Sequence, residues 1–181
     1  MAISISVEPV NVEPILRSVA HIPGAVERAA HRAVSRTLKG AKREAGTLTK
    51  RRYTLPASIV SRSLMLKVSG LSGVMKSRGK RNPLEKAKVA PKNPSRSSHI
   101  RAVVVRGQGG VIRKAFRKKF HPAEGIFVRL HDSRFPIKKL KTVSAPGMVS
   151  HPEVSTPILN KIEHRIGIEL LHAASSILTG V

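Results

Sequence analysis

The chain has 181 residues, of which 40% are hydrophobic but only 3% aromatic, and its 34 Lys and Arg against 10 Asp and Glu give a formal net charge of +24. This length fits one domain whose core is built from aliphatic side chains. Because there is no cysteine, disulfides, thiolate metal sites and Cys nucleophiles are excluded. So many cations repel one another in an isolated compact state, which predicts an anionic partner or acidic neighbouring subunits.

The first 22 residues are expected to form a strand or an extended arm. Ile3, Ile5 and Val7 alternate with polar residues, and prolines follow at positions 9 and 14. Residues 23–181 are then expected to form a single α+β domain. No stretch approaches about 18 uncharged apolar residues, so no contact with a membrane is predicted.

A long amphipathic helix is predicted over residues 24–52, where apolar residues recur at spacings of three and four. The helix is expected to weaken near Gly46. A short helix is predicted over residues 56–61, with Thr54 near its N-cap and Pro56 in the first turn.

A strand over residues 64–68 is expected to turn back at Ser69-Gly70 and to pair with residues 74–75. The next segment, residues 76–98, contains one Gly and three Pro among many Lys and Arg and shows little periodicity. It is predicted to be a long basic loop that is mobile unless bound, and therefore the first site of proteolysis in the free protein.

Three further strands are predicted over residues 101–106, 114–120 and 126–130, with turns at residues 107–110 and 122–125. They are expected to form one antiparallel sheet, with the helices on one face.

A second loop is expected after residue 137, with a short helix over residues 143–149. A long terminal helix is predicted from about Ser155, with Pro157 in its first turn. Its expected buried stripe consists of Ile158, Ile162, Ile166, Leu170 and Ile177, widened by Leu159, Leu171, Ala174 and Leu178.

The residues that enzymes use are sparse. Asp132 is the only aspartate and stands beside His131, but sequence neighbours on a turn do not generally converge on one centre, so a turn is the better interpretation. The eight histidines are scattered without metal-ligand spacing. The glycines at 107–110 lack the Gly-Lys-Ser/Thr of a phosphate loop and indicate a hairpin turn. We therefore expect no enzymatic activity and no cofactor.

The strongest feature is a dense run of cations between residues 76 and 119, with Glu85 as the single acid. We expect this run to form a strongly positive face that contacts either phosphates or acidic protein. Base stacking is not expected, because the aromatic residues are few and the strand phenylalanines are assigned to the core. The candidate interface residues are Lys76, Arg78, Lys80, Arg81, Lys86, Lys88, Lys92, Arg96, Arg113, Lys114, Arg117, Lys118 and Lys119.

Three segments in the second half carry a resemblance to a known family. They are Gly125-Ile126-Phe127-Val128-Arg129, Phe135-Pro136-Ile137-Lys138-Lys139-Leu140 and Ser144-Ala145-Pro146-Gly147-Met148-Val149. This order resembles the C-terminal half of the phage minor tail protein Z family, the tail completion proteins, in which an aromatic-Val-Arg strand precedes Leu-Pro-Ile-x-x-Leu and Ser-x-Pro-x-Met. The matching motif residues are Phe135, Pro136, Ile137, Leu140, Ser144, Pro146 and Met148.

The resemblance implies a structural virion protein at the head-proximal end of the tail, made in the host cytoplasm. It implies self-assembly into a ring, commonly sixfold, and contacts with tail tube, tail terminator or head-connector subunits, with channel DNA as a second expected contact. The alternative function is a non-sequence-specific nucleic-acid-binding protein of the ribosomal or nucleoid kind. A hydrolase that uses His131 and Asp132 ranks last.

Overall fold

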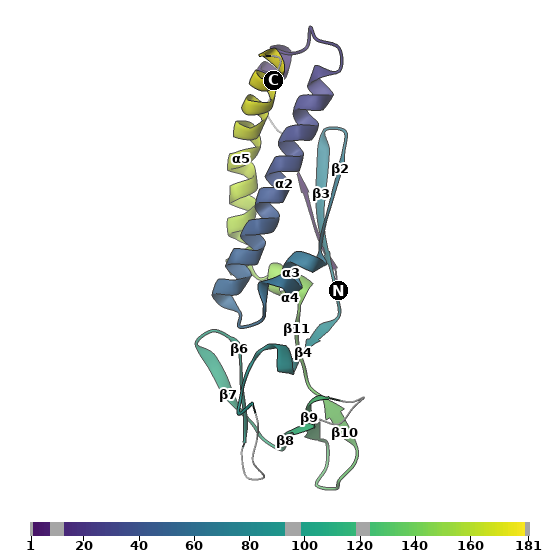
Figure 1. Ribbon diagram of the computed structural model, residues 1–181, viewed down its shortest axis with the longest axis vertical. Helices are drawn as coiled ribbons and strands as arrows, with labels where there is room; N and C mark the ends of the chain where they lie inside the picture. The colour runs from purple at the N-terminus through teal and green to yellow at the C-terminus, as the bar shows by residue number, and fades with distance from the viewer. Residues whose placement is uncertain (1, 8–12, 93–98, 119–123, 180–181) are drawn as a thin grey trace.

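The chain forms two lobes joined end to end (Figure 1). The computed structural model describes residues 2–7, 13–92, 99–118 and 124–179. We call the helix-rich part, the described residues of 2–78 and 145–179, the helical lobe. We call the strand-rich part, the described residues of 79–144, the β-lobe.

The helical lobe contains the long helices and the first three strands. Its helices are α1 Glu13–Arg17, α2 Ala25–Arg52, α3 Ala57–Ser63, α4 Ala145–Val149 and α5 Pro152–Leu178, and its strands are β1 Ala2–Val7, β2 Leu64–Ser69 and β3 Ser72–Arg78. Helices α2 and α5 run antiparallel beside one another, and the sheet lies against the other side of α2 (Figure 1). Helix α2 is therefore the middle layer of this lobe.

Helix α2 confirms the predicted amphipathic helix. Alanines dominate its buried side, and this lets the larger Ile158, Ile162 and Leu170 of α5 approach its backbone closely. The predicted weakening at Gly46 is wrong, because the helix continues to Arg52. Thr49 is buried there, and its hydroxyl donates to the carbonyl of Ala45 at 2.6 Å.

Helix α5 begins three residues before the predicted start. The His151 Nδ1 accepts from the Glu153 N–H at 3.3 Å, and Pro157 lies inside the helix instead of in its first turn. The predicted stripe from Ile158 to Leu170 is buried, and Ala174 is buried as well. The prediction that further residues widen this stripe is wrong for Leu159, Leu171 and Leu178, which are all exposed.

The three-stranded sheet has the order β1-β3-β2 and is antiparallel. The predicted hairpin of β2 and β3 is confirmed, with Leu66 opposite Met75 and Gly70 in the turn at φ 54°. Strand β1 pairs along the whole of β3, with Ile5 opposite Met75, so the N-terminal segment is a strand of the sheet and not a free arm. The short helix α3 is confirmed, but Thr54 does not cap it.

The β-lobe contains short strands arranged in three small antiparallel sheets. Their elements are β4 Arg81–Pro83, η1 Leu84–Lys86, β5 Lys88–Ala90, β6 Ile100–Val105, β7 Gln108–Ile112, β8 Ala115–Lys118, β9 Gly125–Arg129, β10 Ile137–Lys139 and β11 Lys141–Ser144. The strand orders are β10-β9-β8, β11-β4 and β5-β6-β7. The three strands predicted over residues 101–130 are confirmed by β6, β8 and β9, with residues 119–120 outside the described ranges, but they are distributed over two sheets instead of one.

Several expected loops are strands. The predicted long loop over 76–98 is wrong for residues 76–90, which hold the end of β3, β4, η1 and β5; residues 93–98 lie outside the described ranges. Gln108 to Gly110 belong to β7, which leaves only Arg106 and Gly107 in the turn. The loop expected after residue 137 forms β10 and β11.

Each lobe has its own core. Leu84, Val89, Ile100, Ala102 and Ile126 form the centre of the β-lobe. Backbone hydrogen bonds connect the two lobes where α2 ends, from Thr54 N–H to the Val104 carbonyl at 2.9 Å and from Arg106 N–H to the Arg52 carbonyl at 2.8 Å. The fold class is α+β with antiparallel strands and two long helices, as predicted.

Candidate functional site

The positive charge of the β-lobe has few internal partners. Its described residues include sixteen Lys and Arg but only three acids, Glu85, Glu124 and Asp132. Two cations are neutralised within the described part of the chain, Lys114 by Asp132 at 2.5 Å and Lys139 by Glu85 at 3.0 Å. The other fourteen have no acidic partner among the described residues, so this lobe carries a large unbalanced charge.

The helical lobe is less unbalanced, with sixteen Lys and Arg against six acids among its described residues. Three of its ion pairs join α2 to α5: Lys161 bonds to Glu44 at 2.5 Å, Arg52 pairs with Glu153, and Arg36 pairs with Glu169. The hydrogen bond to Glu153 raises the pKa of Arg52 above its ordinary value. These cations are therefore part of the helix packing, while eleven other Lys and Arg of this lobe have no acidic partner among the described residues, against fourteen in the smaller β-lobe.

The predicted interface residues divide between the lobes. Lys76 and Arg78 are exposed on β3, within the helical lobe. Seven exposed members lie in the β-lobe: Lys80, Arg81, Lys86, Lys88, Lys92, Arg113 and Lys114. Arg117 and Lys118 are half-buried in β8, and Arg96 and Lys119 lie outside the described residues. The predicted run of cations is therefore one continuous segment in sequence but several surfaces in space.

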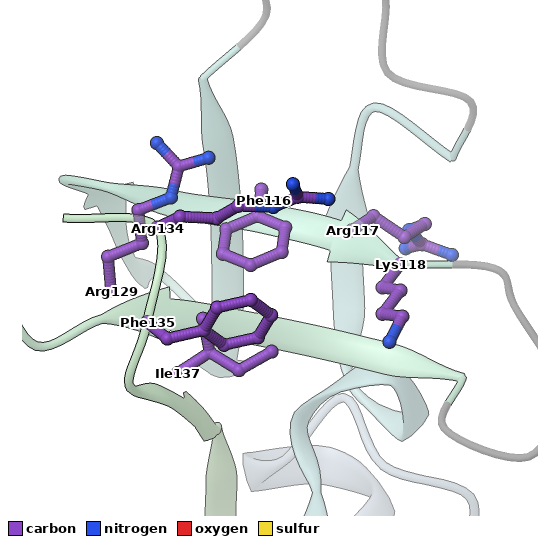
Figure 2. A pocket seen from close by; sticks show the side chains of 7 residues that line it. All are labelled: Phe116, Arg117, Lys118, Arg129, Arg134, Phe135 and Ile137. Carbon is purple, nitrogen blue, oxygen red and sulfur yellow. The ribbon is translucent and has the colours of Figure 1, made fainter.

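One hollow gathers cations and aromatic rings on the sheet β10-β9-β8 (Figure 2). Its volume is about 230 Å³, and its lining residues are Phe116, Arg117, Lys118, Arg129, Arg134, Phe135 and Ile137. The lining includes four cations and no acid. Carbon from two rings and one isoleucine forms its apolar part.

Strand pairing builds this hollow. Phe116 on β8 lies opposite Phe127 on β9, and the two rings stack with centroids 6.1 Å apart. Arg129 at the end of β9 lies opposite Ile137 at the start of β10. The connecting loop is closed by a hydrogen bond from Leu130 N–H to the Pro136 carbonyl at 3.2 Å, and this places Phe135 at the rim.

Guanidinium groups lie over both rings that line the hollow. The Arg129 Cζ is 5.4 Å from the Phe116 ring centroid, and the Arg134 Cζ is 5.8 Å from that of Phe135. Phe135 is 64% exposed. The Nε of Arg117 is buried and has no hydrogen-bond partner among the described residues. The hollow thus offers open ring surface and four positive charges.

The sequence prediction missed half of this arrangement. It named Arg117 and Lys118 as interface residues but not Arg129 or Arg134, it assigned the strand phenylalanines to the core, and it named Phe135 and Ile137 only as family-motif residues. Phe127 is buried as expected, whereas Phe116 is half-buried and Phe135 is exposed. The Arg-Phe pair at 134–135, placed beside a proline in a polar segment, was the available signal.

The family-motif residues fall into two structural groups. Phe135, Pro136 and Ile137 lie at or beside the hollow, and Leu140 packs against the core of the β-lobe. The others are at the junction with the helical lobe, where the Ser144 hydroxyl caps α4 by accepting from Gly147 N–H at 3.2 Å and Pro146 and Met148 are buried.

His131 and Asp132 form no catalytic arrangement in the structure. Both side chains are exposed, and the Asp132 carboxylate accepts from the Lys114 ammonium, which lowers the pKa of Asp132. Among the described residues, no three His, Asp or Glu side chains come together as metal ligands. No helix in the described ranges is both long enough and apolar enough to cross a bilayer.

Comparisons with protein-family models, with curated proteins and with solved structures found no match to this chain. The function is therefore argued from its residues and geometry.

Proposed function

We propose that this chain is a structural assembly protein that docks in a larger particle through the cationic surface of its β-lobe. The specific role that we propose is that of a phage tail completion protein, which acts at the head-proximal end of the tail and is not an enzyme. Its partners would be tail tube, terminator or connector subunits, with channel DNA as a second contact.

One observation carries this proposal: fourteen cations of the β-lobe have no acidic partner among the described residues. Ordinary solubility needs less charge than this, and self-repulsion of this size destabilises a compact state. An anionic surface would relieve the repulsion, and the helical lobe supplies a scaffold with the larger core that presents the β-lobe to it.

Self-association is supported by the outer face of α5. Ile168, Leu171 and Leu178 are exposed on the side away from α2, at a spacing of three and seven residues that puts them in one row. Helix α5 has three Glu against one Lys and one Arg, so it is the less basic of the long helices. A second copy can approach this row without strong repulsion, as closure of a ring requires.

The resemblance to the phage minor tail protein Z family suggests that the larger particle is a phage tail. Phe135 and Ile137 of the motif line the hollow, and Ser144, Pro146 and Met148 lie at the junction between the lobes. Residues at these two places would determine how the β-lobe docks on a partner. This links the tail completion proposal to the charged lobe.

The test is a phage that carries charge-reversed variants of this chain. Changing Lys80, Arg81, Lys86 and Lys88 to Glu is expected to leave the protein folded and to prevent the joining of heads and tails. The matched control reverses four exposed cations of α2 in the helical lobe: Arg28, Arg32, Lys39 and Arg43.

Electron microscopy of lysates would count joined and unjoined particles. Normal particles from the β-lobe variant would remove this surface from the function. Recovery of the wild-type chain with ribosomes or the nucleoid, and not with particles, would favour the nucleic-acid-binding alternative.

A further inference from the structure

We infer that the hollow on the sheet β10-β9-β8 is a binding subsite for one nucleotide of a single-stranded nucleic acid. The base would stack on the exposed ring of Phe135, and the flanking phosphates would meet the four cations that line the hollow. This inference rests on the proposed function in one respect, which is that the β-lobe faces an anionic partner.

The charges argue for an anion inside this hollow in particular. Arg117, Lys118, Arg129 and Arg134 line it together, and none of them has an acidic partner among the described residues. Phosphate oxygens can accept from guanidinium and ammonium N–H groups of these side chains and neutralise several of them at the same time.

The rings argue for a flat, apolar group in addition to the anion. A phosphate alone needs no aromatic surface, yet Phe116, Phe135 and Ile137 form the carbon lining of the hollow. Phe135 is 64% exposed, so without a ligand much of its apolar surface lies in water. Covering that surface with an apolar group would gain hydrophobic free energy. Nucleobases stack on such rings without regard to sequence.

The arrangement favours a nucleotide over an acidic peptide. In Figure 2 the rings of Phe116 and Phe135 stand between Arg129 at one end and Arg117 and Lys118 at the other, and the Arg134 side chain runs along the rings between these ends. In a nucleic-acid strand each base is likewise flanked by a phosphate on both sides. The guanidinium groups already over the rings can extend a stack on a base, because a guanidinium is itself planar. A duplex does not fit, since its bases are already stacked and paired.

The experiment uses the absence of tryptophan from this chain. The Phe135→Trp variant places a single indole in the hollow, and a stacked base quenches indole fluorescence. The matched control is Leu130→Trp, at a site that is 52% exposed on the same loop but outside the hollow. Both full-length variants would be titrated, in salt near 0.15 M, with a fluorescently labelled oligo(dT) strand, with a duplex of equal phosphate number and with polyglutamate.

The expected result is quenching by oligo(dT) at position 135 and none at position 130. The duplex should bind with a change in anisotropy but without quenching. In the otherwise native chain, Phe135→Ala is expected to weaken oligo(dT) binding by roughly five- to a hundredfold, the range for loss of one stacked base. Arg134→Gln should weaken it more than Lys138→Gln, which removes the same charge from an exposed residue outside the hollow.

Three results would overturn the inference: binding without quenching at position 135, equal quenching by the duplex, or quenching by polyglutamate alone, which would assign the hollow to an acidic peptide. None of these would affect the assembly role, which depends on the head-joining test. Conversely, normal particles from the charge-reversed phage together with quenching by oligo(dT) would leave the subsite intact and reject the assembly role.

Discussion

At the scale of single residues, close packing between β3 and α2 leaves no room for a side chain at Gly73. A Cβ on Gly73 would lie 2.4 Å from the Val34 Cγ1 and 2.7 Å from the Leu38 Cδ1, and both of these side chains are fully buried. Neither can move without disturbing the helical core. The sheet therefore sits as near to α2 as the backbone allows.

We predict that Gly73→Ala destabilises the fold by about 1–3 kcal/mol, the usual cost of overpacking a core. The control is Gly46→Ala, within α2, where a Cβ meets nothing within 4 Å. That change should stabilise by about 0.5–1 kcal/mol, because alanine is the better helix former. Urea unfolding followed by circular dichroism would measure both. Equal stability of the two variants would contradict the packing of β3 on α2.

The single aspartate reports on the surface of the β-lobe. Its hydrogen bond with Lys114 lowers the pKa of Asp132 below the ordinary 3.8. A group whose pKa is lower in the folded state contributes stability above its unfolded pKa, and the contribution is lost as the pH falls through the folded pKa. Because the carboxylate is fully exposed, the contribution is small and confined to acid pH.

We predict that Lys114→Met returns the Asp132 titration to its ordinary midpoint. With one aspartate in the chain, selective carboxyl labelling gives a single NMR resonance to follow. The control is Arg113→Met, which removes the neighbouring cation, whereas the ion pair of this carboxylate is with Lys114. An unchanged midpoint in the Lys114 variant would show that the pair does not form in solution.

At the scale of elements, the two faces of α5 have opposite roles. Ile162 is 6% exposed and packs against α2, whereas Leu171 is 52% exposed on the far side. The same substitution therefore separates folding from association.

We predict that Ile162→Asp costs at least about 3 kcal/mol and prevents folding, because it creates a cavity and buries an unpaired charge. Leu171→Asp should remain folded by circular dichroism and should dissociate the assembled form in analytical ultracentrifugation. A folded Ile162 variant would refute the buried stripe, and an assembly unaffected by the Leu171 change would place the contact between copies elsewhere.

The elements that could be predicted from the sequence were those with strong periodicity. Helices α2 and α5 and the hairpin of β2 and β3 repeat their apolar residues over enough turns or pairs to be recognised. Strands β4, β5, β10 and β11 have three or four residues each, too few for a period, and proline and lysine within them imitate a loop. Their pairing is decided by contacts between segments such as residues 81–83 and 141–144, which lie far apart in sequence.

The hollow was harder to predict for a related reason. Arg117 and Lys118 belong to an obvious basic run, but Arg129 and Arg134 join them only through the register of β8, β9 and β10. Sequence composition pointed to an anionic partner. It gave no indication that aromatic surface would accompany the charge, because aromatic residues are few and the strand phenylalanines were expected in the core.

At the scale of the whole molecule, the two lobes divide the work of the proposed function. The helical lobe contains the larger core and most of the ion pairs, and the β-lobe contains more unpaired cations, fourteen against eleven among the described residues, on a smaller core. We predict that the free chain binds anions with strong salt dependence: contacts with about 6 to 10 phosphates would lower affinity by about 10³ to 10⁵ between 50 and 200 mM salt. A titration of duplex DNA at several salt concentrations measures the slope.

The reversal of Lys80, Arg81, Lys86 and Lys88 to Glu should reduce that slope, and the reversal in α2 should reduce it less. Equal slopes for the two variants would mean that the cations of both lobes contribute equally to binding DNA.

The most direct measurement of the central claim is cryo-electron microscopy of tailed particles that contain this chain with a label at α5. The account predicts a closed ring of copies, six in the proposed symmetry, at the head-proximal end of the tail, with each β-lobe against acidic subunits or channel DNA. Particles that assemble and infect normally without the chain would contradict it, as would a ring whose β-lobes face open solvent.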